Sequence, residues 1–230
     1  MKNPTRRNIL TIGLGFAGAL GLTTLGPVGT ARAAASPRPS EWTHKTSTNG
    51  WPITSRDGII IQEVEGAPVN FAVRGGATAT VLAYIARRFV YEIDSAIRDG
   101  DVTGHTSDRN IATAFESNYL SGTAIAIRPD SYPLGAKDGL FPHELVVVRD
   151  ILAECDGIVR WGGDEPTPKE SHFQIDVGPE DQRLRVLAAK ISQWDRTPGK
   201  GAGSVDAFLP SRRRVARDME QRQEAWRVAR

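Results

Sequence analysis

A single cysteine, Cys155, is the feature that most limits how this chain can fold. One thiol cannot form an internal disulfide, and it excludes a zinc module built from several cysteines. The fold must therefore depend on a core of apolar side chains. The chain has 230 residues, of which 40% are hydrophobic and 24% charged, so it can bury such a core without covalent cross-links. Cys155 follows Leu145, Val148 and Leu152 at helical spacing, and we expect it inside the core rather than in a reactive site.

The net charge of +2 is distributed unevenly along the chain. Residues 1–33 contain four basic residues and no acid, which gives +4. Residues 34–208 contain 18 basic and 24 acidic residues, a net of −6, and residues 211–230 contain seven arginines and three acids, a net of +4. The total is too small to indicate a nucleic-acid-binding protein.

Residues 1–33 have the pattern of an export signal. The adjacent Arg6 and Arg7 precede a Gly/Ala-rich apolar run over 9–26, and the small residues Ala31 and Ala33 follow. This layout is typical of a cleavable signal peptide, and the arginine pair indicates the twin-arginine kind. The alternative is a membrane anchor, but the run is short and diluted by glycine for a span of about 20 residues. We expect a protein that is secreted by the twin-arginine pathway and keeps no transmembrane anchor after cleavage.

Alternating strand and helix patterns follow this segment. Residues 34–50, rich in Ser, Pro and Thr, predict a flexible lead-in. The expected strands are 59–61, 69–73, 122–127, 158–161 and 172–175. The expected helices are 77–97, 143–155 and 179–194, each with one apolar face.

Beyond the predicted domain at 51–195, the sequence indicates a linker at 196–210 and a basic tail helix at 211–230 that begins near three consecutive arginines. The tail is either a solvated charged helix or a basic helix that binds an anionic surface such as cell-wall polymers or lipid headgroups.

Four short motifs in the domain point to a family. They are S-N-Y-L-S-G-T-A-I-A-I at 117–127, Y-P-L-G at 132–135, W-G-G-D at 161–164 and H-F-Q-I at 172–175. Together these motifs resemble the zinc D-alanyl-D-alanine carboxypeptidase family, which includes the vancomycin-resistance D,D-carboxypeptidases and phage endolysins that cut peptidoglycan stem peptides. The resemblance covers roughly residues 48–192. It implies an α+β fold, a small antiparallel sheet of about four to six strands with helices packed on one side, and the strand and helix patterns agree with it.

The resemblance also implies a zinc site. The family's first motif reads S-x-H-x-x-G-x-A-x-D, and its second reads W-G-G-D with an acid three residues before a last His. The two histidines and the aspartate would bind zinc and leave one position for water, and the acid would transfer a proton from that water to the leaving amine. Here Tyr119 and Ala126 occupy two of the ligand positions, Lys169 occupies the acid position, and His172 is the only ligand retained. Glu170, one residue closer to His172, is the candidate catalytic acid by a small shift.

The resemblance also implies residues that surround the substrate without binding the metal. By resemblance, Arg109 would face the terminal carboxylate of the substrate, and Ser117, Gly122 and Trp161 would shape the site. Each has a structural alternative: Arg109 as a surface arginine, Tyr119 as a packing or hydrogen-bonding residue and His172 as a structural histidine. Other ligand candidates by residue type alone are His105, Glu116, Asp130, His143 and Glu165.

These substitutions leave three functional hypotheses. The first is a secreted, catalytically degenerate D,D-carboxypeptidase-like protein that binds peptidoglycan stem peptide or another cell-wall component. The second is an active zinc D,D-carboxypeptidase or stem-peptide endopeptidase with rewired ligands. The third is a secreted interaction protein unrelated to the wall, in which Tyr119 and Lys169 help to form a new site. We expect a monomer without a cofactor, and zinc only under the second hypothesis.

Overall fold

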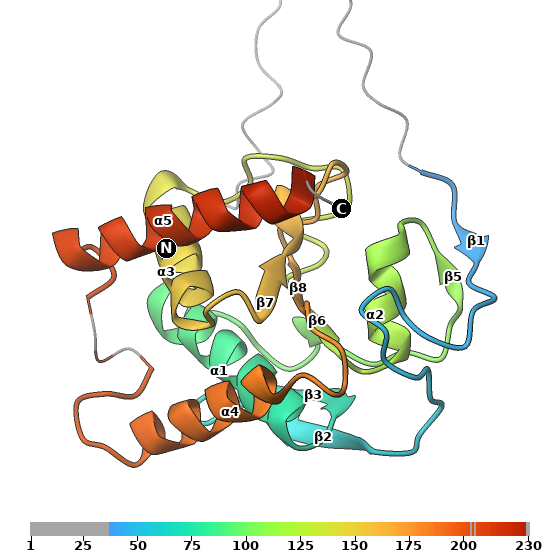
Figure 1. Ribbon diagram of the computed structural model, residues 1–230, viewed down its shortest axis with the longest axis horizontal. Coiled ribbons are helices and arrows are strands. Elements are labelled where there is room, and N and C mark those ends of the chain that lie inside the picture. Colours follow the sequence, from blue (N-terminus) through green and yellow to red (C-terminus); the bar gives the residue numbers. More distant parts are fainter. Residues whose placement is uncertain (1–36, 203, 205, 229–230) are drawn as a thin grey trace, which may run out of the picture. The chain divides into compact units, whose positions relative to one another are not determined.

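The computed structural model describes residues 37–202, 204 and 206–228, so the expected export signal at 1–33 lies outside the described residues. All the elements lie in one compact unit, residues 35–230. Figure 1 shows their order along the chain, with these bounds: β1 (Ser40–Glu41), β2 (Ile59–Glu63), β3 (Asn70–Arg74), α1 (Ala77–Glu92), β4 (Val102–Thr103), β5 (Asn110–Ile111), η2 (Ala114–Glu116), α2 (Ser117–Leu120), β6 (Ala124–Ile127), α3 (Pro142–Glu154), β7 (Val159–Trp161), η3 (Gly162–Asp164), β8 (His172–Ile175), α4 (Gln182–Asp195) and α5 (Pro210–Val228).

The strands form three small antiparallel sheets. The largest, which we call the central sheet, has the strand order β4-β6-β8-β7. The two others are the pairs β2-β3 and β1-β5. In the central sheet Ile125 lies opposite Phe173, and Ala126 lies opposite His172. Helices and small antiparallel sheets thus build a mixed fold consistent with the expected α+β class.

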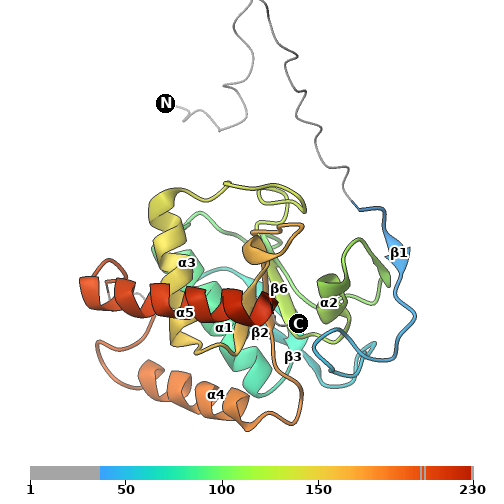
Figure 2. The ribbon, with the colours of Figure 1, turned by 45° about the horizontal axis from the view of Figure 1, so that its top comes forward.

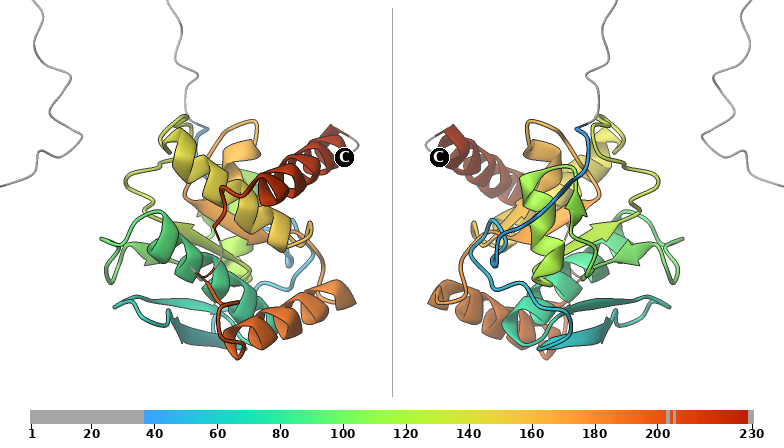
Figure 3. Two further views of the ribbon diagram at one scale, coloured as in Figure 1. Left: turned by 90° about the vertical axis from the view of Figure 1, so that its left-hand side faces the viewer. Right: turned by 90° about the vertical axis from the view of Figure 1, so that its right-hand side faces the viewer.

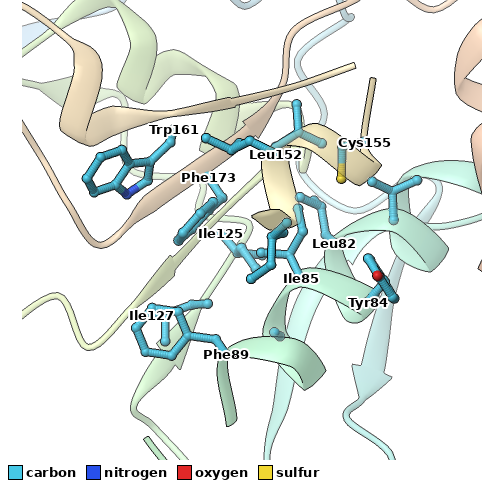
Figure 4. Close-up of a cluster of buried hydrophobic side chains, with 14 of the residues drawn as sticks. Leu82, Tyr84, Ile85, Phe89, Ile125, Ile127, Leu152, Cys155, Trp161 and Phe173 are labelled. Atoms are coloured by element: carbon cyan, nitrogen blue, oxygen red, sulfur yellow. The ribbon is translucent and has the colours of Figure 1, made fainter. Parts of the chain in front are cut away.

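One face of the central sheet carries the main core. Because side chains alternate along a strand, the odd-numbered residues of β6 and β8 point to the same face. Ile125, Ile127 and Phe173 are fully buried there with side chains of α1 and α3 (Figure 4). The Phe89 ring on α1 meets the Phe173 ring edge to face at 6.4 Å between centroids. Cys155 is buried in this core, as the sequence predicted, and burial raises the pKa of its thiol to about 12.

The opposite face of the central sheet is also covered. The sequence predicted helices on one side only, and the longer helices α1 and α3 do pack on the main-core face. On the other face, Ala124 and Ala126 contact Tyr119 of α2. Figures 1 and 3 show α2 on the side of the strands away from α1. The small alanines allow α2 to lie close to the sheet, and this layer holds the candidate site.

The segment expected as a flexible lead-in is part of the fold over residues 40–50. Strand β1 pairs with β5, and Thr46 forms a bridge with Pro52. The Asn49 side-chain amide donates hydrogen bonds of 2.8 Å to the carbonyl of Ile175 and to Thr123. The domain therefore begins about ten residues before the predicted boundary at 51, because the polar side chains of this segment satisfy buried groups of the sheet layer.

The C-terminal helix is likewise more than a solvated tail. Helix α5 begins at Pro210 and lies across α3 (Figure 2). Met219 is only 1% exposed, and the guanidinium of Arg212 donates to the buried carboxylate of Asp150 at 2.8 Å. The domain therefore extends beyond the predicted limit at 195, because α5 contributes buried apolar area and an ion pair to the same unit.

Candidate functional site

Five side chains between α2 and β8 form a buried polar group, which we call the His172 cluster: Glu116, Tyr119, Lys169, His172 and Gln174. Tyr119 reaches it from α2, and His172 and Gln174 reach it from the same face of β8. The rings of Tyr119 and His172 lie 5.0 Å apart between centroids, and the Lys169 ammonium lies 5.1 Å from the Tyr119 ring. Ala126 is the strand partner of His172. The structure therefore gathers all four positions at which the family resemblance implies zinc ligands or the catalytic acid.

Both ring nitrogens of His172 are occupied. Tyr119 Oη lies 2.6 Å from Nδ1, and Gln174 Oε1 lies 2.8 Å from Nε2. The same Gln174 oxygen accepts from the Asn118 side-chain amide at 2.8 Å, so it acts as an acceptor and Nε2 must carry the imidazole proton. The Tyr119 hydroxyl then donates to Nδ1.

Electrostatics keep His172 neutral. Burial lowers the pKa of His172 to about 3; the bond to Gln174 opposes this shift, and the charge of Lys169 adds to it. Burial also raises the pKa of the Tyr119 hydroxyl well above its usual value. At neutral pH the pair is thus an uncharged phenol bonded to an uncharged imidazole.

Lys169 is neutralised inside the cluster. Its ammonium lies 2.6 Å from the Glu116 carboxylate, and both side chains are largely buried. Burial alone would raise the pKa of Glu116, but Lys169 and the backbone N–H groups of Ala112 and Thr113 lower it below its ordinary value. Of the alternative ligand candidates, Glu116 does reach the His172 cluster, where its charge is already paired. His105 instead lies 2.7 Å from the carbonyl of Thr54, outside the cluster.

This donor set does not fit a catalytic zinc ion. Such an ion needs three protein ligands, whereas Ala126 has no donor atom, Tyr119 gives its hydroxyl proton to His172, and Lys169 places a positive charge beside them. Among the described residues, no group of three His, Cys, Asp or Glu side chains is placed to hold a metal ion.

Glu170 does not act at the cluster. Its carboxylate accepts from the backbone N–H groups of Asp138, Gly139 and Leu140, at 3.0, 2.9 and 3.2 Å. The expected small shift of this acid toward His172 is therefore not seen, because Glu170 points to the loop that precedes α3 and orders its backbone.

Three of the predicted substrate-binding residues are buried parts of the frame. Ser117 Oγ accepts from the backbone N–H of Thr48 at 2.9 Å. Gly122 has a φ of 69°, and a Cβ there would lie 2.5 Å from an Ile59 methyl group, so only glycine fits. Trp161 donates from its indole to the carbonyl of Glu170 at 2.7 Å. Ser117, Gly122 and Trp161 are thus buried and held by contacts within the protein.

Arg109 is the fourth predicted substrate-binding residue, and it lies elsewhere. Its guanidinium donates to the carbonyls of Trp42 and His44, at 2.7 and 2.6 Å. These bonds hold the lead-in segment beside β5. Two of the three guanidinium nitrogens of Arg109 are thus used to hold this segment.

An open, polar cleft of ≈ 500 Å³ lies in front of the His172 cluster, lined by Thr48, Asn49, Ala114, Phe115, Arg160, Glu165, Gln174 and Asp176. Phe115 packs on the His172 ring at 4.8 Å and, with Gln174, separates the imidazole from the cleft. In the lining of the cleft, Arg160 bridges Glu165 at 3.3 Å and Asp176 at 3.1 Å. Tyr119 and Phe115 therefore fill the space beside the His172 ring, while the outer part of the cleft is accessible.

Apart from Gln174, which lies in the H-F-Q-I motif, and Glu165, a ligand candidate by residue type, none of the residues that line the cleft is singled out by the sequence. Gln174 and Asp176 could have been found from strand alternation, because they follow His172 at steps of two and share its face. Phe115, Arg160 and the lead-in residues carry no such signal. Comparison of the chain with protein-family models, curated proteins and solved structures found no match.

Proposed function

We propose that this chain is a secreted, catalytically inactive relative of the zinc D-alanyl-D-alanine carboxypeptidases that binds peptidoglycan stem peptide or another cell-wall component. The observation that carries the proposal is the convergence of positions 119, 126, 169 and 172. The sequence motifs imply these four positions without reference to the structure. If the motif match were accidental, the four positions would not be expected to lie close together in the fold.

The contacts of the His172 cluster support an inactive site. Tyr119 and Gln174 hold both imidazole nitrogens, and Glu116 neutralises Lys169. A rewired peptidase would need new ligands near His172, and the described residues offer no set of three.

The accessible cleft supports a binding role. It offers amide, hydroxyl and charged groups in a concave surface of the size that small ligands and peptide ends occupy. Secretion is proposed from the pattern of residues 1–33. In the described part of the chain, the helices are too short or too polar to cross a bilayer.

Zinc content tests the inactive part of the proposal. The protein from residue 35 onward, incubated with excess zinc and then dialysed, should retain far less than one equivalent by atomic absorption. The triple variant Tyr119→His, Ala126→Asp, Lys169→Asp should bind about one equivalent, because it supplies the missing donors and removes the positive charge. The matched control adds His172→Gln to the triple variant and should lose that zinc again. Tight stoichiometric zinc in the unaltered protein would refute the proposal.

Binding to the cell wall tests the second part. The unaltered protein should co-sediment with purified peptidoglycan and bind soluble muropeptides in calorimetry. Arg160→Gln, in the lining of the cleft, should weaken binding by about tenfold, the effect expected from losing one charged contact. Arg185→Gln, on the exposed side of α4, is the control for the loss of one charge. Absence of binding to either wall preparation would instead favour an interaction protein unrelated to the wall.

A further inference from the structure

The start of α5 presents apolar side chains to solvent in an ordered turn. Asp206 accepts from the backbone N–H of Phe208 at 2.8 Å, and Ala207 is buried in the core. This turn holds Phe208 and Leu209 outward, 47% and 45% exposed. Their exposure is thus built into the fold rather than due to a loose end.

Two arginines continue this apolar site along the helix. Leu209, Arg213 and Arg217 are spaced by four residues, and the backbone N–H of Arg213 donates to the carbonyl of Leu209, so the three lie on one side of α5. Among the described residues neither arginine forms an ion pair, unlike Arg212, which is bound to Asp150. No acid occurs from 207 to 217.

A shallow groove of ≈ 180 Å³ separates these arginines from α3, and its lining residues are Pro142, Leu145, Val146, Arg149, Arg213, Ala216, Arg217 and Glu220. Arg149 pairs with Glu220 at 3.1 Å, so the excess positive charge comes from Arg213 and Arg217. Figures 1 and 2 place the first turns of α5 at an edge of the domain, beyond α3. This edge combines an apolar groove lining, exposed apolar side chains and two arginines that form no ion pair with the described residues.

We propose that this edge, comprising the turn with Phe208 and Leu209 and the groove flanked by Arg213 and Arg217, docks on the surface of an anionic phospholipid bilayer. The arginines complement the lipid phosphates, and the two apolar tips enter the headgroup boundary. A soluble polyanion would use the arginines but gain nothing from Phe208 and Leu209. The inference does not depend on the function proposed for the His172 cluster.

Vesicle sedimentation of the protein from residue 35 onward, which contains every described element, tests this inference. Binding should be much stronger to phosphatidylcholine vesicles that contain phosphatidylglycerol than to phosphatidylcholine alone, and high salt should reduce it. Arg213→Gln with Arg217→Gln should lower partitioning by about tenfold or more, and Phe208→Ser with Leu209→Ser should also lower it by about tenfold. All four side chains are exposed, and matching circular dichroism melts should show that the variants fold.

The control Arg56→Gln with Arg98→Gln removes the same charge from exposed loops elsewhere and should leave binding within about twofold. Equal binding to neutral and anionic vesicles would overturn the inference, as would an equal loss in the control. Unchanged vesicle binding after Phe208→Ser with Leu209→Ser would also overturn it, and would identify a polyanion site in place of a membrane-docking edge.

Discussion

At the scale of single residues, Tyr119 and His172 show how a hydroxyl donor can stabilise a buried imidazole. The imidazole is buried, and its Nδ1 atom depends on the Tyr119 hydroxyl for a hydrogen bond. Tyr119→Phe should therefore reduce the free energy of unfolding by about 1–3 kcal/mol, the range for a buried acceptor left without a partner. Urea unfolding measures this change.

Tyr91→Phe is the matched control for that substitution. Its hydroxyl donates to the carbonyl of Glu65 at 2.8 Å on the exposed surface, where water can replace it. The control should change the free energy of unfolding by less than about 0.5 kcal/mol. Equal effects of the two substitutions would mean that the bond between Tyr119 and His172 contributes nothing specific.

At the scale of elements, α5 tests whether the C-terminal helix belongs to the folded unit. Met219 is buried against α3, whereas Val215, one turn earlier, is 52% exposed. Met219→Ala should lower the free energy of unfolding by about 2–4 kcal/mol, and Val215→Ala should lower it by less than about 0.5 kcal/mol. Thermal melts of both variants give the comparison. A solvated, independent tail would show two equal and negligible effects.

At the scale of the whole molecule, the sequence predicted the elements whose apolar side chains alternate or repeat. Strand β8 and helix α3 lie close to their expected bounds because each buries a regular apolar face, whereas α1 begins as expected but ends at Glu92 rather than at 97. The lead-in was missed because it is held by polar contacts such as those of Asn49, which composition alone assigns to a loop. The docking of α5 was missed for a similar reason. From the sequence alone Arg212 is expected at the surface, and only the structure shows that it is paired with Asp150.

The candidate site was predictable in its positions but not in its contacts. The family resemblance implies that positions 119, 126, 169 and 172 lie together, and in the structure Ala126 is the strand partner of His172. Spacing could not show that Glu170 turns toward the loop at 138–140 while Lys169 turns toward Glu116. The direction of a side chain in a turn depends on which partners the tertiary structure offers it.

The buried imidazole also makes the stability of the whole molecule depend on pH. In the folded protein the pKa of His172 is about 3, while in the unfolded chain it is about 6.5. As pH falls below about 6.5, the unfolded state binds a proton that the folded state excludes. The stability contributed by the neutral imidazole is therefore complete above this pH and is lost as pH falls toward 3.

Between pH 7 and 5 this linkage should lower the free energy of unfolding by about 2 kcal/mol, and most carboxylates stay ionised in that window. Urea titrations of the unaltered protein and of His172→Gln, at pH 7, 6 and 5, give the comparison; the other histidines are present in both proteins and cancel. The unaltered protein should lose more stability than the variant over this range. Imidazole proton resonances of His172 should also stay constant down to about pH 4. A resonance that titrates near pH 6.5, with parallel stability curves, would mean that water reaches His172 and that the cluster opens in solution.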